Sequence, residues 1–288
     1  MKELKIEKLF NGYVGLEIEG GFNSRCNNME LGQAIEDAGC EKDHDFTNTG
    51  AYHDDVEFKT EGNEGISTSY LADHITDIEY LASEYDFITD AQSAGLHCNI
   101  SKKNGFSKRD LANIYYLFYA LEDELFNLMP EARSYNRHSG KSYDNSYRTY
   151  RVSREFISQI KQELLKWEDS FNLLEFLEIG DALTKCNPLS FHKVRYSSEY
   201  QKRVEDLKYF NGPVEFRFLD ANMDNLRFNI MLCQRIVDLA TSKGQTTYKM
   251  LKMVKKIKKR GTLKYLLLRL RFSQNDIKYI ENQLNKNI

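Results

Sequence analysis

Four segments of the chain alternate between apolar and polar side chains, and this pattern constrains the fold more than any other feature. The segments are VGLEIEG (14–20), DVEFKTE (55–61), GLHCNIS (95–101) and PVEFRFLD (213–220). Because successive side chains of a β-strand point to opposite faces, each segment predicts a strand with one apolar and one polar face. Together they predict an antiparallel sheet that packs its apolar face against helices.

The polar positions of these segments carry many charged side chains. They are Glu17, Glu19, Glu57, Lys59, Glu61, His97, Asn99, Glu215 and Arg217. A solvated sheet face is the plainer interpretation of such alternation. Carboxylates repel one another across neighbouring strands, however, and a divalent cation bound between them removes that repulsion. The pattern therefore favours a metal site, for which the candidate ligands are Glu17, Glu19, Glu57, His97 and Glu215.

The remaining periodicity is mostly helical. It predicts helices over 29–38, 66–84, 107–129, 153–179, 223–242, 246–259, 262–271 and 274–285. Ser107 is the expected N-cap of the third helix, with Asp110 at its third position. We expect an acidic turn over 43–55 and a β-like pair within 190–220. Residues 131–150 are polar and aperiodic, which predicts a long loop, and such loops are usually functional or disordered.

Charge is distributed unevenly along the 288 residues, although the net charge is only −3. Residues 1–90 hold 21 Asp and Glu against 6 Lys and Arg, whereas residues 243–288 hold 13 Lys and Arg against 2 Asp and Glu. This asymmetry predicts a main domain over 1–242 and a basic helical C-terminal extension over 243–288. The extension is compatible with binding to nucleic acid or an anionic membrane, but we favour helices packed on the body with a solvated lysine face.

Several classes of protein are disfavoured by what the sequence lacks. No apolar run is long enough to span a membrane, and the N-terminal segment has no apolar signal core. The five cysteines are widely spaced and form no C-x-x-C pair, so we expect a cytoplasmic protein without membrane insertion. The sequence contains no P-loop motif, no G-x-G-x-x-G motif and no G-x-S-x-G motif.

The order of the four strand motifs resembles the amidoligase family of carboxylate–amine ligases, which are relatives of the glutamine synthetase and glutamate–cysteine ligase fold. The resemblance spans roughly residues 12–240 and rests on short motifs. The matching positions are Gly15, Glu17 and Glu19 for G-x-E-x-E, Glu57 for the second strand, Gly95 and His97 for the third strand, Pro130, Arg133 and Arg137 for a Pro- and Arg-containing element, and Glu215, Phe216 and Arg217 for the closing E-F-R. Two positions depart from the family pattern. Lys59 and Thr60 replace a Ser-Pro pair, and Asn99 replaces a second His.

The resemblance implies an α+β fold with a curved antiparallel sheet, whose polar concave face is the active site and whose other face is backed by helices. It implies an ATP- and Mg²⁺-dependent ligase that forms an amide or peptide bond through an acyl phosphate. The partners would be a carboxylate and an amine carried by small molecules, peptides or proteins. Resembling proteins are common in bacterial and phage genomes.

The resemblance also assigns roles to individual residues. Glu17, Glu19, Glu57, Glu215 and His97 would hold the metal. Arg217 and Lys59 would meet the phosphates of ATP and act in catalysis together with Glu57, and Arg133, Arg137 and Asn99 would bind substrate.

Two alternatives remain open. One is a catalytically inactive binding or structural protein on the ligase fold, motivated by the departures at Lys59, Thr60 and Asn99. Such a protein would associate with nucleic acid through the basic helices of 243–288. The other concerns single side chains. Glu215 and Arg217 would form an exposed ion pair that contributes little to stability. Arg133 and Arg137 in the predicted loop would be solvated and would bind no substrate.

Overall fold

A computed structural model describes residues 4–22, 28–44, 55–60, 65–88, 95–129, 158, 161–162, 188–195, 210–243 and 247–284. Within these ranges only the backbone is described for residues 22, 28–32, 41–44, 55–59, 88, 192, 195 and 247. The predicted helix over 153–179 and the predicted loop over 131–150 therefore lie almost wholly outside the described residues.

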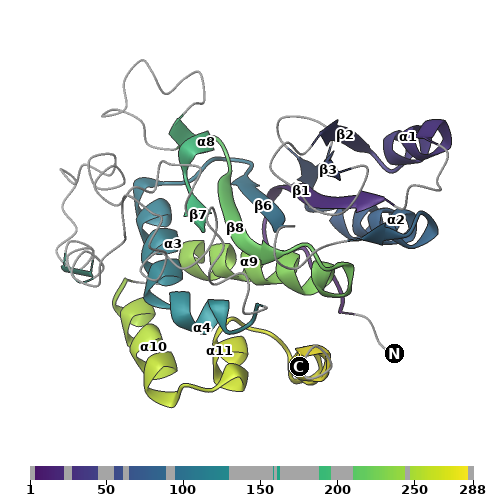
Figure 1. Cartoon of the computed structure of the whole chain (residues 1–288). Helices are drawn as coiled ribbons and strands as arrows, with labels where there is room; N and C mark the ends of the chain where they lie inside the picture. Colours follow the sequence, from purple (N-terminus) through teal and green to yellow (C-terminus); the bar gives the residue numbers. More distant parts are fainter. Residues whose placement is uncertain are drawn as a thin grey trace, which may run out of the picture.

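Within the described residues, eight strands form a single sheet at the centre of the fold (Figure 1). The strands are β1 (Gly12–Phe22), β2 (Cys40–His44), β3 (Asp55–Thr60), β4 (Ile66–Ser67), β5 (Phe87–Ile88), β6 (Gly95–Lys102), β7 (Leu189–Ser190) and β8 (Val214–Asp220). The main path runs β2-β3-β1-β6-β8-β7, while β4 and β5 pair with β1. Every strand pairing in the described part of the chain is antiparallel. The mixed composition of helices and an antiparallel sheet is thus confirmed.

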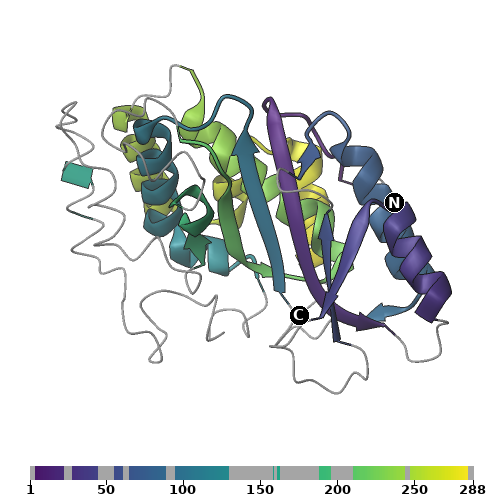
Figure 2. The ribbon, with the colours of Figure 1, turned by 90° about the horizontal axis from the view of Figure 1, so that it is seen from above.

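The helices flank this sheet. They are α1 (Asn28–Asp37), α2 (Leu71–Glu84), α3 (Lys108–Ala120), α4 (Glu122–Phe126), α8 (His192–Arg195), the 3₁₀ helix η2 (Met223–Asn225), α9 (Leu226–Thr241), α10 (Thr247–Arg260), α11 (Leu263–Arg269) and α12 (Gln274–Leu284). In Figure 2 the strands β1, β6 and β8 lie side by side, with α9 and the C-terminal helices behind them. Every helix in the described ranges is too short or too polar to span a lipid bilayer.

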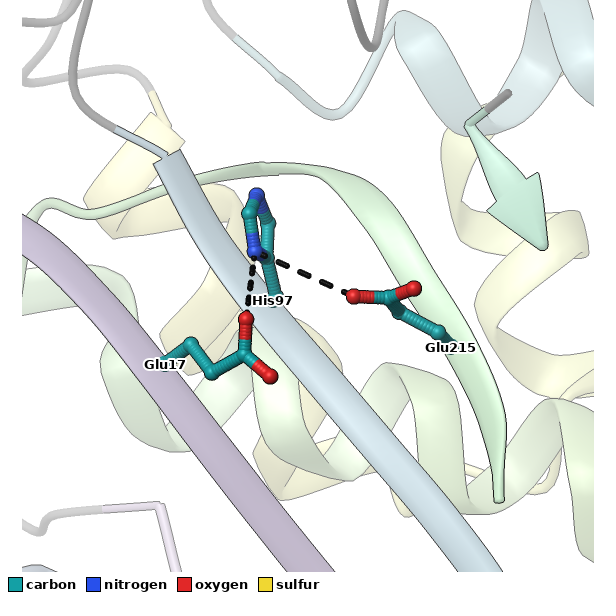
Figure 3. A group of neighbouring side chains, drawn as sticks. All are labelled: Glu17, His97 and Glu215. Atoms are coloured by element: carbon teal, nitrogen blue, oxygen red, sulfur yellow. Dashed lines mark hydrogen bonds and ion pairs between the residues drawn. The ribbon is translucent and has the colours of Figure 1, made fainter. Parts of the chain in front are cut away.

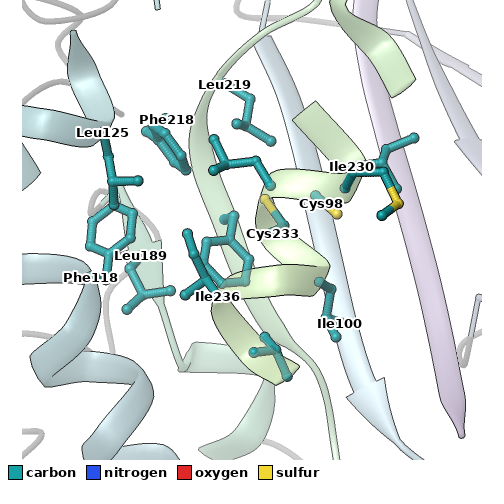
Figure 4. Close-up of a cluster of buried hydrophobic side chains, with 14 of the residues drawn as sticks. Cys98, Ile100, Phe118, Leu125, Leu189, Phe218, Leu219, Ile230, Cys233 and Ile236 are labelled. Carbon is teal, nitrogen blue, oxygen red and sulfur yellow. The ribbon is translucent and has the colours of Figure 1, made fainter. Parts of the chain in front are cut away.

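The core lies between the sheet and helices α3 and α9. Alternate residues of β1, β6 and β8 are at most 1% exposed, and they are Leu16, Ile18, Leu96, Cys98, Ile100, Val214 and Phe216. Cys233 and Ile236 of α9 belong to the same apolar cluster (Figure 4). The rings of Phe118 on α3 and Phe218 on β8 meet edge to face, with their centroids 5.2 Å apart. Burial of one face of each strand fixes the opposite face as the polar one.

A β-bulge interrupts the alternation in β8. Cys98 pairs with Phe216 and Leu96 pairs with Leu219, so β8 has one more residue between these pairs than β6 has. The extra residue returns Leu219 to the apolar side, where it is fully buried. Bulges change the direction in which side chains point. Glu215 and Arg217 therefore lie on the polar face before the bulge ends, and Leu219 lies on the apolar face beyond it.

Helix α3 begins as the sequence predicts. The Ser107 hydroxyl accepts a hydrogen bond from the Asp110 N–H at 3.1 Å, and Asp110 Oδ2 accepts one from the Ser107 N–H at 3.0 Å. This reciprocal capping box satisfies two backbone donors at the helix start. The prediction that one helix continues to residue 129 is wrong, because the helix breaks at Leu121 and α4 follows. The break lets Phe126 pack on Phe218, with their centroids 5.6 Å apart.

Other boundaries also differ from the sequence prediction. The helix expected over 66–84 begins only at Leu71, because Ile66 and Ser67 pair with β1 and Tyr70 is 69% exposed. The acidic turn expected over 43–55 is wrong at both ends, since 43–44 belong to β2 and residue 55 belongs to β3. Of the pair expected within 190–220, β8 is present and the two-residue strand β7 pairs with it, while residues 196–209 lie outside the described residues.

The basic C-terminal segment is helical, as predicted, and it packs against the rest of the protein. Met250, Val254 and Ile257 of α10 are at most 4% exposed and join the main apolar core. Arg235 on α9 contacts both the segment before β1 and the turn between α11 and α12. Its Nη2 lies 2.8 Å from Glu7 Oε2, and its Nη1 donates to the backbone oxygen of Arg271 at 2.6 Å.

Candidate metal centre

Three neighbouring strands bring one cluster of polar side chains together. The register of β1 and β6 places Glu17 opposite His97, and the register of β6 and β8 places Asn99 opposite Glu215. Figure 3 shows Glu17, His97 and Glu215 projecting from adjacent strands toward one another. The cluster forms because the alternate residues of each strand are held in the core, which leaves these positions on the other face.

The distances within the cluster suit a bound cation. His97 Nδ1 lies 3.0 Å from Glu17 Oε2 and 3.9 Å from Glu215 Oε1. One ligand atom from each of the three residues lies within 4.8 Å of the others. Two carboxylates supply the oxygen ligands that hard divalent cations prefer, and the imidazole adds a nitrogen ligand that Mn²⁺ and Zn²⁺ also accept. This donor set therefore fits a divalent metal ion.

Lys193 supplies a positive charge to the same cluster. Its Nζ donates to Glu17 Oε1 at 2.5 Å and to Asn99 Oδ1 at 3.1 Å, and it lies 3.6 Å from Glu215 Oε1. The position of Lys193 follows from the elements around it. Strand β7 pairs with β8 at Phe216 and Glu215, and the buried side chains of Phe191 and Val194 then anchor the short helix α8.

The charge state of Glu17 is set by these neighbours. Burial by itself raises the pKa of the Glu17 carboxyl, because it removes water from the charged form. The hydrogen bond from His97 and the positive charge of Lys193 act in the opposite direction and outweigh burial. The pKa of Glu17 is consequently held well below its usual range. Glu17 is an anion at neutral pH and is available as a metal ligand.

Glu19 lies on the other side of the His97 ring. Its Oε1 is 3.4 Å from His97 Nε2, and its Oε2 accepts a hydrogen bond from the Gly95 N–H at 2.6 Å. A metal ion on Nδ1 requires the ring proton to be on Nε2, where Glu19 can accept it. Carboxylates in this position orient a metal-binding imidazole and fix its tautomer. The group of ligand atoms that lie close together comprises Glu17, His97 and Glu215, whereas Glu19 contacts the Nε2 side of the His97 ring and would orient that ring in a metal site.

Two further polar residues border the cluster. Asn99 Nδ2 donates to Glu17 Oε1 at 3.1 Å, so the amide holds the carboxylate from the side. Arg217 Nη1 donates to Glu215 Oε1 at 3.1 Å. Because the side chain of Glu215 is 1% exposed and that of Arg217 is 16% exposed, this pair is not the exposed ion pair that the plainer interpretation expected. Arg217 thus places a guanidinium beside the possible metal position.

The other predicted site residues are described only in part or not at all. The backbone register places Glu57 opposite Glu19 and Lys59 opposite Glu17, while the side chains of both residues lie outside the described part. Arg133 and Arg137 also lie outside the described residues. Of the predicted site residues, the structure therefore brings together Glu17, Glu19, His97, Asn99, Glu215 and Arg217.

Lys193 is the residue of the cluster that the sequence did not reveal. It lies outside the four alternating segments, and a single lysine beside His192 carries no pattern of its own. Lys193 follows the short segment that forms β7, but the sequence does not show that β7 pairs with β8 and so brings Lys193 to the cluster.

Comparison with models of known protein families and with curated proteins finds no match to this chain.

Proposed function

We propose that this protein is an ATP-dependent carboxylate–amine ligase that uses a divalent metal ion, with Mg²⁺ or Mn²⁺ as the cation. The observation that carries the proposal is the convergence of Glu17, His97 and Glu215 from three adjacent antiparallel strands, with ligand atoms within 4.8 Å. These are the positions at which the sequence resembles the amidoligase motifs. In this proposal residues 1–242 form the ligase domain, and the cluster lines the concave polar face of a curved sheet.

The reaction sets the chemical demands on the site. A substrate carboxylate attacks the γ-phosphorus of ATP, and the bond to ADP breaks to give an acyl phosphate. The amine nitrogen then attacks the acyl carbon, inorganic phosphate leaves, and the nitrogen loses a proton to give the amide. Both steps develop negative charge on phosphate oxygens, so fixed cations beside those oxygens lower the barrier.

The residues of the cluster can meet these demands. Glu17, His97 and Glu215 would hold the metal ion, which when bound neutralises phosphate oxygens. Arg217 would present its guanidinium to the phosphoryl group that is transferred, with Lys59 as a second cation. Asn99, Arg133 and Arg137 would bind the substrates, and the acyl phosphate would be shielded from water by the segment 131–150. Such a reaction would take place in the cytoplasm, where ATP is available.

The test combines metal binding with turnover. We expect Mn²⁺ to bind in isothermal titration calorimetry, and ADP to be released when ATP, Mg²⁺ and a mixture of carboxylates and amines are supplied. Glu17→Gln and Glu215→Gln keep the size of each side chain but remove the charge, so both should lose metal binding and ADP release. Glu36→Gln, which changes an exposed carboxylate on α1, is the matched control and should retain both. Metal binding that survives both cluster substitutions would refute the proposed site.

A second function is favoured by one specific observation. The Lys193 ammonium already neutralises Glu17, and a cluster with an internal cation can be stable without a metal ion. This arrangement suits a catalytically inactive binding protein on the same scaffold. ATP binding without ADP release over a broad panel of carboxylates and amines would support this alternative, while amine-dependent ADP release would exclude it.

A further inference from the structure

Helix α10 carries two stripes of opposite chemistry along its length. Its apolar stripe is Met250, Val254 and Ile257, which are buried in the main core. Its opposite face carries four exposed lysines, which we call the lysine stripe: Lys252, Lys255, Lys256 and Lys259. The spacing of i, i+3, i+4 and i+7 places these four residues on one face of the helix. Because the apolar stripe packs into the core, the lysine stripe points toward solvent.

This region of the sequence carries positive charges without acidic residues between them. Residues 239–275 contain eleven Lys and Arg and no Asp or Glu. Within the residues that the structure describes, no lysine of the stripe takes part in an ion pair. Like charges held together on one rigid helix repel one another, and a bound polyanion relieves this repulsion. Binding of an anionic partner to the stripe therefore lowers the free energy of the system.

We propose that the lysine stripe binds the phosphate backbone of nucleic acid without regard to sequence. The four lysines extend over seven helical steps, which is roughly 10 Å at 1.5 Å per residue. One strand of a duplex places about three to four phosphates along that length, at one phosphate per 3.4 Å. Long lysine side chains reach phosphates singly as point charges, so the stripe matches the backbone in both length and charge.

The packing of α10 disfavours a membrane as the partner. An amphipathic helix binds a membrane by burying its apolar face among the lipids. In this protein that face is already buried against the core, and α10 also packs against α3 and α11. Only the charged face remains for a partner. Nucleic acid needs no apolar contact, because charge neutralisation supplies essentially all of its sequence-independent binding.

Fluorescence anisotropy with a labelled DNA duplex tests this proposal. The full-length protein should bind the duplex at low salt, and the logarithm of the association constant should fall with the logarithm of salt concentration. If each of the four lysines meets one phosphate, the slope is about −3.6, at about 0.9 per phosphate. The triple variant Lys252→Gln, Lys255→Gln and Lys259→Gln should bind at least tenfold more weakly, with a shallower slope. Its apolar stripe is unchanged, so circular dichroism should show the native helix content.

A matched control separates the stripe from the overall charge. The triple variant Lys5→Gln, Lys103→Gln and Lys278→Gln removes the same charge from exposed lysines elsewhere, and it should bind the duplex nearly as well as the wild type. Vesicles of anionic phospholipid should bind more weakly than the duplex at the same ionic strength. No duplex binding at low salt, an equal loss in both triple variants, or stronger binding to the vesicles would each overturn the proposal.

Discussion

Lys193 Nζ lies 2.5 Å from Glu17 Oε1, which places a lysine ammonium inside the group of side chains that we propose as a metal centre. The same ammonium lies 3.6 Å from Glu215 Oε1. A divalent ion in the proposed site would therefore compete with the ammonium for oxygens of the same two carboxylates. Lys193 neutralises part of the charge of the cluster, and for the same reason it would oppose metal binding there.

This competition predicts the effect of replacing Lys193 by methionine, which keeps an unbranched apolar side chain and removes the charge. We expect Lys193→Met to bind Mn²⁺ about tenfold more tightly than the wild type, because the metal no longer displaces an ammonium. A factor of ten corresponds to about 1.4 kcal/mol of binding free energy. Isothermal titration calorimetry at neutral pH measures the change directly.

The control for this experiment is Lys103→Met, which removes an exposed lysine just beyond the end of β6. Its affinity for Mn²⁺ should equal that of the wild type. Weaker or unchanged Mn²⁺ binding by Lys193→Met would show that the lysine does not compete with the metal for Glu17.

Glu19 offers a test of positioning as distinct from ligation. The two carboxylate oxygens of Glu19 meet two different groups: one accepts a hydrogen bond from the Gly95 N–H, and the other lies 3.4 Å from His97 Nε2. Glutamine in this place is neutral and has a single acceptor oxygen, so it cannot accept from both groups. We expect Glu19→Gln to weaken Mn²⁺ binding by roughly 10- to 100-fold, as loss of a partner of a metal-binding His usually does. Calorimetry should still detect binding, in contrast to Glu17→Gln.

A complete loss of Mn²⁺ binding in Glu19→Gln would instead make Glu19 a ligand in its own right. The sequence does predict this residue as a ligand. An unchanged affinity would show that the orientation of His97 does not depend on Glu19.

Much of the candidate site could be predicted from the sequence because strand periodicity is local. Alternation alone put Glu17, His97 and Glu215 on polar faces, and it needed no knowledge of which strands are neighbours. The pairing of β1 with β6 and of β6 with β8 depends on contacts between distant segments. Lys193 could not be predicted for this reason, since its position follows from the pairing of the two-residue strand β7 with β8.

The fold shows the same division between local and tertiary causes. The start of α3 was predictable, because the capping box is contained in four consecutive residues. The break at Leu121 was not predictable, because an apolar pattern of helical period continues through it, whereas the packing of Phe126 on Phe218 joins segments that are distant in the sequence. Ile66 likewise has an apolar spacing that suits α2, yet pairing with Val14 draws it into the sheet.

The capping box of α3 predicts a measurable contribution to stability. We expect Ser107→Ala to lower the free energy of unfolding by about 1 kcal/mol, because the Asp110 N–H then loses its acceptor at the helix start. Ser107→Thr retains a hydroxyl and should lose much less. Urea unfolding followed by circular dichroism measures both variants, and equal losses would mean that the hydroxyl is not the cause.

The lowered pKa of Glu17 predicts how the stability of the protein depends on pH. Glu17 has an ordinary pKa of 4.5 when unfolded and a much lower one when folded, so its charged form stabilises the folded state. This contribution is complete above about pH 4.5, and it is lost as the pH falls toward the folded pKa. The difference in unfolding free energy between the wild type and Glu17→Gln should therefore shrink as the pH is lowered from about 5 to about 3. Urea unfolding at a series of pH values measures this difference.

Lys193→Met provides the control for that experiment, because it removes one of the two neighbours that lower the pKa of Glu17 while His97 remains. The contribution of Glu17 should then be smaller at neutral pH and should change less between pH 5 and pH 3. The measured sign decides the question, since a Glu17 whose burial outweighed its partners would have a raised pKa. In that case the wild type would gain stability relative to Glu17→Gln as the pH falls, and the electrostatic account of the cluster would be wrong.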